Sequence, residues 1–342
     1  MKNREEKKGR FWFVVLLCAL IVGFVVSLTL GKYPVTLKDI PAVFSHLVFG
    51  TEATYEHAVE TALYKVRLPR LLCCVFTGVA LSVSGGAYQG VFRNPMVSPD
   101  LLGASSGAAF GACCAILISA STLVMHITAF AFGVGAVALT YVVSSAISRK
   151  TRSTITLVLT GMVVSALFNA GVSITKTLAD TDDKLGEITF WLMGSMTHMR
   201  PDTILILIIP VLVGVIPLLA FSYRLNLLSF GDEEARTMGV NVKAMRLLFI
   251  FCATLATSAS VAACGMVGWI GLVIPHFMRL LVGPDYHRLL PATALAGGLF
   301  LLLVDNITRI FFQVEVAIGI LTAIIGAPVF LVLLVQRRDG WL

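Results

Sequence analysis

The chain has 342 residues, of which 57% are hydrophobic and 13% are charged, and its formal net charge at pH 7 is +7. An ordinary soluble domain carries about 25% charged residues, so this composition excludes a soluble globular protein and indicates a polytopic membrane protein. Basic residues flank the apolar runs, so the positive charge points to the lipid bilayer and requires no nucleic acid as a partner.

We predict an all-α fold in which one domain contains ten membrane spans. A span needs about 20 apolar residues, and the chain length allows roughly ten of them with short loops. The N-terminal run follows basic residues like a signal peptide, but its length and the lack of a small-residue cleavage site favour a retained span. The predicted spans cover residues 11–30, 66–88, 101–120, 124–147, 154–178, 203–222, 244–264, 266–282, 289–307 and 316–335.

The distribution of basic residues predicts that both termini are cytoplasmic. An even number of spans places both termini on one side, and cytoplasmic loops carry an excess of Lys and Arg. With the termini inside, the inner segments hold seventeen of the 26 basic residues, and nine remain outside. The inner set is Lys2, Arg4, Lys7, Lys8, Arg10, Arg93, Arg149, Lys150, Arg152, Arg224, Arg236, Lys243, Arg246, Arg279, Arg288, Arg337 and Arg338.

Small residues recur at every fourth position in several predicted spans. In the second and third spans they are mainly glycines, and such stripes let helix backbones approach closely. In the fifth span the stripe is more polar and consists of Gly161, Ser165, Asn169, Ser173 and Thr177. A polar stripe in a span either bonds to neighbouring helices or lines a wet path, and the sequence leaves both interpretations open.

A polar segment of residues 225–240, LNLLSFGDEEARTMGV, separates the sixth and seventh predicted spans. Carboxylates from Asp232 to Glu234 complement the positive end of a short helix, and Gly239 is placed as its C-cap glycine. Such a helix is either a solvated connector or a contact surface for a partner in the cytoplasm.

Several kinds of site are absent from the sequence. There is no phosphate-binding G-x-x-x-x-G-K-[ST] loop, so the chain is not expected to hydrolyse ATP alone. There is also no H-E-x-x-H and no G-x-S-x-G motif. The seven cysteines lack metal-ligand spacing and are interpreted as packing residues. His276 has no partners at ligand spacing and is interpreted as a packing or hydrogen-bonding residue, not a metal ligand. No Asp or Glu falls at the middle of a predicted span, since Asp305 and Glu315 lie near the outer ends. Ion-coupled carriers usually keep such a group, so the energy is expected to come from a partner.

Four stretches of the chain carry a resemblance to a known family. They are RLPRLL at 67–72, SGGAYQGVFRNPMVSPDLLGASSGAAFGA at 84–112, GWIGLVIPHFMRLLVGPDYHRLLPATALAGGLFLLLVDNITR at 268–309 and IGILTAIIGAPVFLVLL at 318–334. In this order they resemble the FecCD-type permeases of bacterial ABC importers for iron chelates, haem and cobalamin. The resemblance runs from about Leu63 to the C-terminus.

The resemblance implies a type II ABC importer permease with ten spans in the bacterial inner membrane. It implies two cytoplasmic ATPase subunits that bind ATP and Mg, an extracytoplasmic substrate-binding protein and a second permease subunit. We expect that subunit to be another copy of this chain, with a homologous chain as the alternative. The permease itself is expected to have no cofactor, no metal and no enzymatic activity.

The resemblance also implies roles for particular residues. Arg67, Arg70 and Arg309 match arginines that contact the binding protein, and the alternative for them is contact with lipid phosphates. The path matches Gly161, Ser165, Asn169 and Ser173, and the inner gate matches Thr154 and Ile155, where Ile155 departs from the usual small polar residue. The ATPase-coupling helices match the segment with Leu228, Gly231, Asp232, Glu233, Glu234, Ala235, Arg236 and Gly239.

We therefore expect the permease subunit of an importer for an iron(III) chelate of the siderophore type. Haem and cobalamin are alternatives within the same family. The alternative from another class is a secondary transporter or channel that works without ATPase partners.

Overall fold

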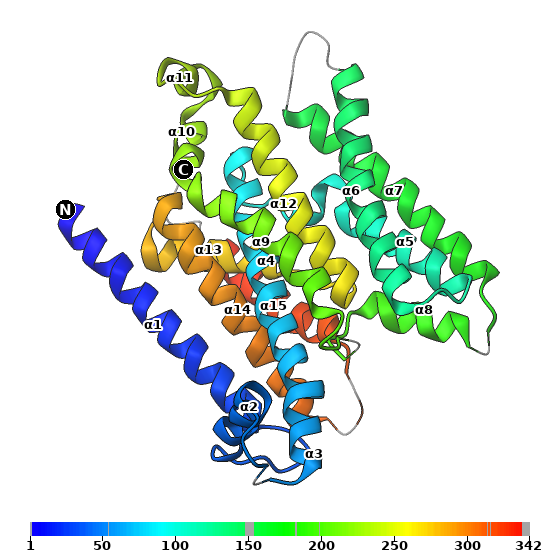
Figure 1. The fold of residues 1–342 in the computed structure, drawn as a ribbon. Coiled ribbons are helices and arrows are strands. Elements are labelled where there is room, and N and C mark those ends of the chain that lie inside the picture. Colours follow the sequence, from blue (N-terminus) through cyan, green and yellow to red (C-terminus); the bar gives the residue numbers. More distant parts are fainter. Residues whose placement is uncertain are drawn as a thin grey trace.

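The computed structural model describes residues 2–53, 55–147, 154–181, 183–197, 199–312, 314 and 316–336, and within these ranges the chain is helical with no strand. The helices form one bundle, with α1 along one edge and α6 and α7 along the opposite edge (Figure 1). The elements are α1 Lys2–Thr29, α2 Asp39–Phe49, α3 His57–Glu60, η1 Thr61–Arg67, α4 Leu68–Val91, η2 Pro99–Leu102, α5 Ala104–Leu117, α6 Thr122–Ile147, α7 Thr154–Leu178, α8 Lys184–Met193, α9 Ile204–Ala220, α10 Ser222–Phe230, α11 Asp232–Thr237, α12 Val242–Cys264, α13 Ile270–Val282, α14 Tyr286–Phe311 and α15 Ile318–Gln336.

Each predicted span contains a helix, but not every helix is long enough to cross a membrane. Six helices in the described ranges have the necessary length and apolarity, or seven if α9 and α10, which meet at 58°, form one bent span. α5 has 14 residues and α13 has 13, so each covers only about 20 Å of a hydrocarbon core about 30 Å thick. The count of ten spans therefore stays a prediction.

The two short helices, α5 and α13, each begin after a residue with positive φ, which interrupts the helix within an apolar stretch of the sequence. Gly103, with φ of 92°, separates η2 from α5, and Trp269, with φ of 71°, precedes α13. The predicted eighth span, residues 266–282, therefore begins in non-helical backbone at residues 265–268, and its helix starts at Ile270. A neighbouring segment bonds to the residue before this stretch: the Ser195 N–H donates to the carbonyl of Cys264, the last residue of α12, at 2.8 Å. Irregular backbone within a membrane needs such partners inside the protein.

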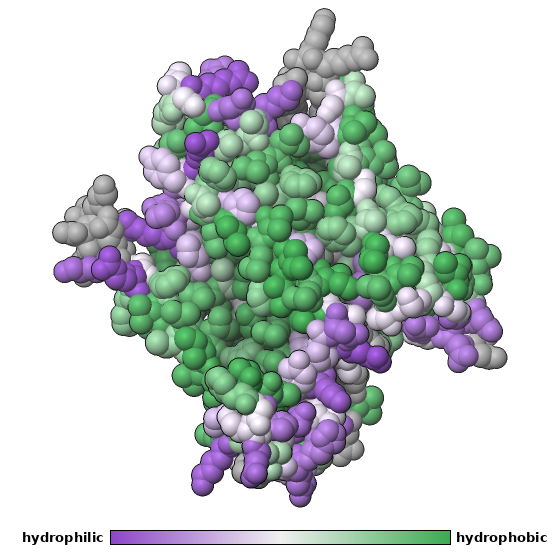
Figure 2. All heavy atoms as spheres, in the orientation of Figure 1, coloured by the Kyte–Doolittle hydropathy of each residue, from purple (hydrophilic) through white to green (hydrophobic). Residues whose placement is uncertain are grey.

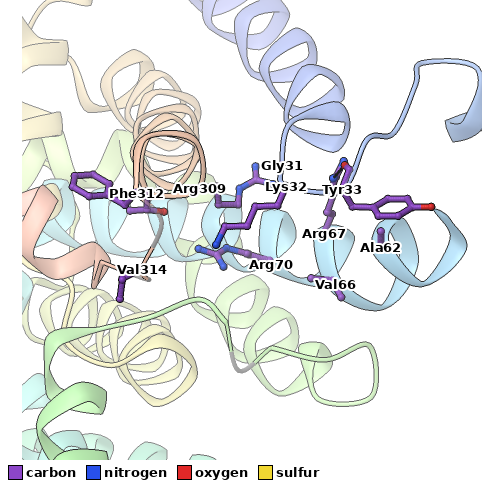
Figure 3. A pocket seen from close by; sticks show the side chains of 11 residues that line it. Gly31, Lys32, Tyr33, Ala62, Val66, Arg67, Arg70, Arg309, Phe312 and Val314 are labelled. Carbon is purple, nitrogen blue, oxygen red and sulfur yellow. Dashed lines mark hydrogen bonds between the residues drawn. The ribbon is translucent and has the colours of Figure 1, made fainter. Parts of the chain in front are cut away.

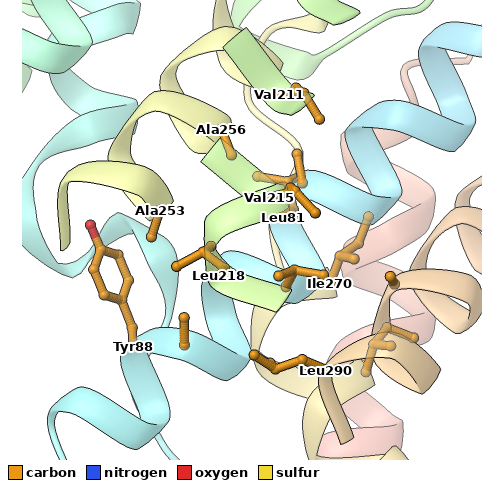
Figure 4. Packing of buried hydrophobic residues seen from close by; sticks show 14 of the residues in the cluster. Leu81, Tyr88, Val211, Val215, Leu218, Ala253, Ala256, Ile270 and Leu290 are labelled. Carbon is orange, nitrogen blue, oxygen red and sulfur yellow. The ribbon is translucent and has the colours of Figure 1, made fainter. Parts of the chain in front are cut away.

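The centre of the bundle is α4, which packs against α9, α12, α13 and α14. In the most apolar stretch of each helix, 78% is buried for α4 and for α12, but only 11% is buried for α1. A Cβ on Gly78 would overlap the carbonyl of Gly297 on α14, and one on Gly85 would overlap the carbonyl of Gly271 on α13. The prediction that the small residues of the second span form a packing face is confirmed. Figure 4 shows the apolar side chains that fill the space between these helices.

The polar residues gather at two opposite ends of the bundle, and a broad apolar band separates them (Figure 2). The end with α2 and α3 carries the three predicted docking arginines and is called the arginine end. The opposite end carries α10 and α11 and is called the coupling end (Figure 1). α1 starts at the coupling end. Gly9 of α1 lies so close to Arg288 that an added Cβ would contact its side chain. Arg288 in turn lies 3.8 Å from Asp285, which is bonded to α10.

Candidate functional site

A cavity of about 410 Å³ opens at the arginine end between the segment after α1, the start of α4 and the end of α14. Figure 3 shows Lys32, Arg70 and Arg309 directed toward one another across it. The lining consists of Gly31, Lys32, Tyr33, Ala62, Val66, Arg67, Arg70, Thr308, Arg309, Phe312 and Val314. The fold therefore brings together the three arginines that the sequence predicts as one site, although Arg309 lies more than 230 positions after Arg67 and Arg70.

Two of these arginines share one buried carboxylate. The Arg70 Nε lies 2.8 Å from Asp305 Oδ1, and the Arg309 Nε lies 2.9 Å from Asp305 Oδ2. Asp305 and Arg309 are four residues apart on α14, so they lie on one face of the helix. The Asp305 side chain is fully buried, and the two guanidinium side chains are 12% and 11% exposed. A carboxylate at this depth needs paired charges, and the two arginines supply them.

Arg67 differs from the expectation that its guanidinium faces a partner. It is 5% exposed, and it donates to the carbonyl of Leu28 at 2.6 Å and to the carbonyl of Tyr33. Arg309 contacts the same segment by donating to the Leu30 carbonyl at 3.0 Å. The arginines take these positions because the last carbonyl groups of a helix accept no hydrogen bond within the helix. Arg67 and Arg309 donate to such carbonyl groups at and after the end of α1. Docking by Arg67 stays a prediction.

Positively charged side chains are concentrated at the cavity. Lys32, Arg67, Arg70 and Arg309 line it, and the Asp305 carboxylate pairs with two of them. At the rim, the Tyr33 hydroxyl donates to Glu56 at 3.0 Å, and this hydrogen bond is the main cause of a raised pKa for Tyr33. Chemically, the cavity suits a carboxylate or another anion, which guanidinium groups can bind through two parallel hydrogen bonds.

At the coupling end, the predicted coupling segment contains two short helices, α10 and α11, and α11 begins at Asp232, where the sequence predicts a helix start. Gly231, with φ of 133°, joins them, and Gly239, with φ of 81°, follows the end of α11 as the predicted cap glycine. The Asp232 carboxylate accepts two hydrogen bonds from Arg246 Nη2, at 2.9 and 3.1 Å. It also lies 3.7 Å from Arg93 Nη2. These contacts fix the start of α11 against α12 and the end of α4.

The predicted coupling residues divide into two groups in the structure. Leu228 and Ala235 are 3% and 0% exposed and attach the two helices to the bundle. Glu233, Glu234 and Arg236 are exposed on the outer side of α11. The inward group therefore holds the segment in place, while the outward group is accessible to a partner.

The predicted path residues lie on α7, whose other side packs against α5, α6 and η2. Gly161 is buried in that packing, because a Cβ there would overlap the carbonyl of Leu101. Ser165 is partly buried, whereas Asn169 and Ser173 are exposed among apolar side chains. The Ser173 hydroxyl donates to the Asn169 carbonyl at 3.1 Å, so it is satisfied within the helix. The stripe thus contributes both to packing and to an open, uncharged face.

Two further predictions concern segments at the limits of the description. Thr154 begins α7, but its side chain lies outside the described residues; Ile155 is 69% exposed. The basic residues Arg149, Lys150, Arg152, Arg337 and Arg338, and also Glu315, lie outside the described residues. Among the described residues no group of three His, Cys, Asp or Glu could hold a metal. Five cysteines are buried and Cys114 is partly buried, in agreement with a packing role, whereas Cys18 is exposed on α1 and its packing role stays a prediction.

The sequence reasoning did not assign three residues that the structure places in these sites. They are Asp305, the shared partner of Arg70 and Arg309; Lys32, beside the cavity; and Arg246, the partner of Asp232. The spacing of Asp305 and Arg309 by four residues was a signal for the first, because such pairs meet on a helix surface. Sequence spacing gave no comparable signal for Lys32 or Arg246.

Comparison with known proteins identifies the family. The FecCD transport family matches residues 19–336. The molybdate import system permease protein MolB of Haemophilus influenzae is 39% identical, with 94% of each chain covered. The Fe(3+) dicitrate transport system permease protein FecD of Escherichia coli is also 39% identical, with 94% of this chain and 95% of FecD covered.

A solved structure agrees with this result. An inward-facing metal-chelate type ABC transporter is 37% identical, with a TM-score of 0.84 over 95% of this chain and 98% of that one. ATP hydrolysis in such transporters resides in separate subunits, so this chain is not itself an enzyme. The chain therefore belongs to the FecCD transport family and is a membrane permease subunit of an ABC importer.

Proposed function

We propose that the chain is the inner-membrane permease for an iron(III) chelate, with ten spans and cytoplasmic termini. In this proposal the arginine end faces outward and receives the chelate from a substrate-binding protein. The coupling end faces the cytoplasm and contacts two ATPase subunits, which bind ATP and Mg. Two copies of the chain enclose the path between them, and Gly161, Ser165, Asn169 and Ser173 of α7 contribute to it.

The observation that carries the coupling role is the division of α10 and α11 into an attached side and an exposed side. Asp232, Leu228 and Ala235 fasten the two helices to the bundle. Glu233 and Glu234 remain exposed. A partner that moves this segment therefore moves the helices to which it is fastened, whereas a flexible loop would absorb the displacement.

The charge of the cavity supports docking at the arginine end. Arg70 and Arg309 line this cavity with two further cationic side chains, and guanidinium groups bind carboxylates through parallel hydrogen bonds, so a carboxylate from a partner can join Asp305 there. Arg70 and Arg309 are partly accessible at the cavity, while Arg67 would have to exchange its backbone acceptors for a partner carboxylate. Docking is thus assigned mainly to Arg70 and Arg309, with Arg67 in a supporting position.

The exposed face of α7 favours a chelate as the substrate. Its residues near Asn169 and Ser173 are uncharged, and Ile155 at the proposed inner gate is apolar. Such a surface offers few strong ligands, which suits an iron(III) ion whose charge is enclosed by its chelator. Haem and cobalamin, which are also enclosed metal ions, remain alternatives.

Molybdate is a second candidate, and the observation that favours it is the 39% identity to MolB over 94% of each chain. Molybdate is a bare dianion, and a path for it is expected to present more hydrogen-bond donors or cationic groups than the described face of α7 does. The alternative of a secondary transporter is set aside, because the chain belongs to a family of ABC importer permeases. The fully buried carboxylate of Asp305 is also paired with two arginines and is therefore poorly suited to bind and release a coupling ion.

The first experiment is a pull-down of the tagged chain from its native membrane. We expect an ATPase subunit to be recovered with the wild-type chain and to be lost from the Glu233→Lys/Glu234→Lys variant, which leaves the structural Asp232 intact. The control is Glu52→Lys/Glu187→Lys, which makes the same charge change at exposed positions away from α11. Recovery of the chain without an ATPase, under conditions that preserve other ABC complexes, would contradict the proposal.

The second experiment tests the substrate in proteoliposomes that contain the recovered complex and its binding protein. Uptake of radiolabelled ferric citrate, a ferric hydroxamate, haem, cobalamin and molybdate is compared with and without ATP. The proposal expects ATP-dependent uptake of a ferric chelate. Uptake of molybdate alone would favour the second candidate, and uptake that does not depend on ATP would contradict the proposal.

A further inference from the structure

One side chain of α10 connects the coupling segment directly to the start of α14. The Asn226 Nδ2 donates to Asp285 Oδ1 at 2.6 Å, and the Asn226 Oδ1 accepts from the Tyr286 N–H at 2.8 Å. Asp285 is the N-cap of α14 and also accepts from the His287 N–H at 3.0 Å. Asn226 therefore uses both its donor and its acceptor on one neighbouring helix terminus, which fixes the position and the direction of that contact.

The same contact extends to α4 at the centre of the bundle. The Tyr286 hydroxyl accepts from Arg279 Nη2 at 3.2 Å, and Arg279 Nη1 donates to Gln89 Oε1 at 2.6 Å. In addition, Leu225 packs so closely on Gly90 that no side chain fits there. α10 is thus tied to α14 by Asn226 and to α4 by Leu225.

α14 joins the two polar ends of the molecule. Its 26 residues give a length of about 39 Å at 1.5 Å per residue. It begins at the Asn226 contact and carries Asp305 and Arg309 near its other end. Between these points Gly297 packs against Gly78 and Ser82 with no space for a Cβ. A displacement at the start of α14 is therefore carried along a closely packed helix to the cavity.

We propose that Asn226 is a positioning residue that transmits movement of α10 and α11 through α14 to the arginine cavity. The inference rests on the proposed contact of α10 and α11 with the ATPase. It goes further by naming the side chain and the helix through which ATP binding changes the cavity. Asn226 does not contact substrate or ATP in this scheme, and it acts through Asp285 and Tyr286.

The test follows the accessibility of the cavity directly, and the substrate need not be known. A Val314→Cys substitution places a thiol in the cavity lining, where Val314 is 79% exposed. The parent protein for this test also carries Cys18→Ala, because Cys18 is the exposed cysteine among the described residues. The rate of labelling by a membrane-impermeant maleimide is measured on the complex with ATPase subunits, with and without Mg-ATP. We expect ATP to change this rate about fivefold or more, the lower range of allosteric coupling.

Three variants in this background test the role of Asn226. Asn226→Asp places a carboxylate against Asp285, and we expect the ATP effect on labelling to disappear while ATPase recovery and basal ATP hydrolysis remain. The double variant Asn226→Asp/Asp285→Asn exchanges the two side chains and again pairs one amide donor with one carboxylate. We expect the ATP effect on labelling to return in this variant. Asn241→Ala is the matched control, because Asn241 caps α12 at the same end by accepting from Ala244 N–H at 3.1 Å but is not seen to bridge to α14.

The outcomes separate this inference from the proposed function. If ATPase subunits are recovered but ATP does not change labelling in the parent, or if Asn226→Asp retains the full effect, the inference is overturned. Failure of the exchange variant to regain the effect also overturns it, because repulsion at Asp285 would not be the cause. Absence of ATPase subunits from the parent complex would instead contradict the proposed function. If Asn226→Asp does not accumulate, Asn226→Ala makes the same test without adding charge.

Discussion

Replacing Asp305 by Asn is the sharpest test of the charge arrangement at the arginine end. The substitution keeps the side-chain volume but removes the negative charge that two arginines share. Asp305 is fully buried, its oxygens lie 2.8 and 2.9 Å from the two Nε atoms, and the guanidinium side chains are 12% and 11% exposed. Breaking a buried ion pair by removing one partner costs about 3–5 kcal/mol, and here both guanidinium groups lose the carboxylate that they share.

We expect the lower part of this range, about 3 kcal/mol, since Arg309 keeps its bond to the Leu30 carbonyl. The free energy of unfolding can be measured by SDS titration in mixed micelles, with the fluorescence of the four tryptophans as the signal. Asp202→Asn is the control, because Asp202 is exposed at the start of α9 and surface substitutions usually change stability by less than about 0.5 kcal/mol. A loss below about 1 kcal/mol for Asp305→Asn would show that the buried charges are not coupled as the geometry indicates.

Three further predictions concern the packing, the coupling segment and the path. Gly297→Ala should reduce the yield of folded protein, measured by size-exclusion chromatography, because its Cβ would overlap Gly78 backbone; Gly135→Ala, with open space at its Cβ position, should not. Arg246→Gln removes the bidentate partner of Asp232 and should lower ATPase affinity about fivefold, or about 1 kcal/mol, whereas Lys243→Gln should not. Asn169→Leu should slow ATP-dependent uptake with ATPase recovery unchanged, whereas uptake by the exposed apolar control Met162→Leu should equal the wild type.

The sequence was sufficient to predict the class of the fold and the grouping of its polar residues. Composition requires a membrane protein, and apolar runs locate a helix in every predicted span. The basic residues predicted for the cytoplasmic side include Arg93 and Arg246, and both meet Asp232 at the coupling end. These features are local, because apolar length, charge and glycine spacing each act within a few turns of one helix.

The lengths and breaks of the helices depended on tertiary packing. In the eighth predicted span, Gly268, Gly271 and Pro275 indicate a kinked helix. They do not specify that the backbone at Trp269 has positive φ and that the helix begins one residue later. In the folded chain the Ser195 N–H donates to the carbonyl of Cys264, the last residue before the non-helical stretch 265–268, so this point depends on a contact between distant segments.

The roles of the arginines also depended on the three-dimensional structure. The motif around Arg67 and Arg70 indicates an anion site but cannot distinguish a partner carboxylate from an internal one. In the fold, Asp305 pairs with Arg70 across 235 positions of sequence, and Arg67 donates to carbonyls of the segment after α1. Sequence alone determined which charges the chain carries, whereas only the packing of α14 against α4 decided how they pair, because a buried charge takes the partner that the fold brings within a few ångströms.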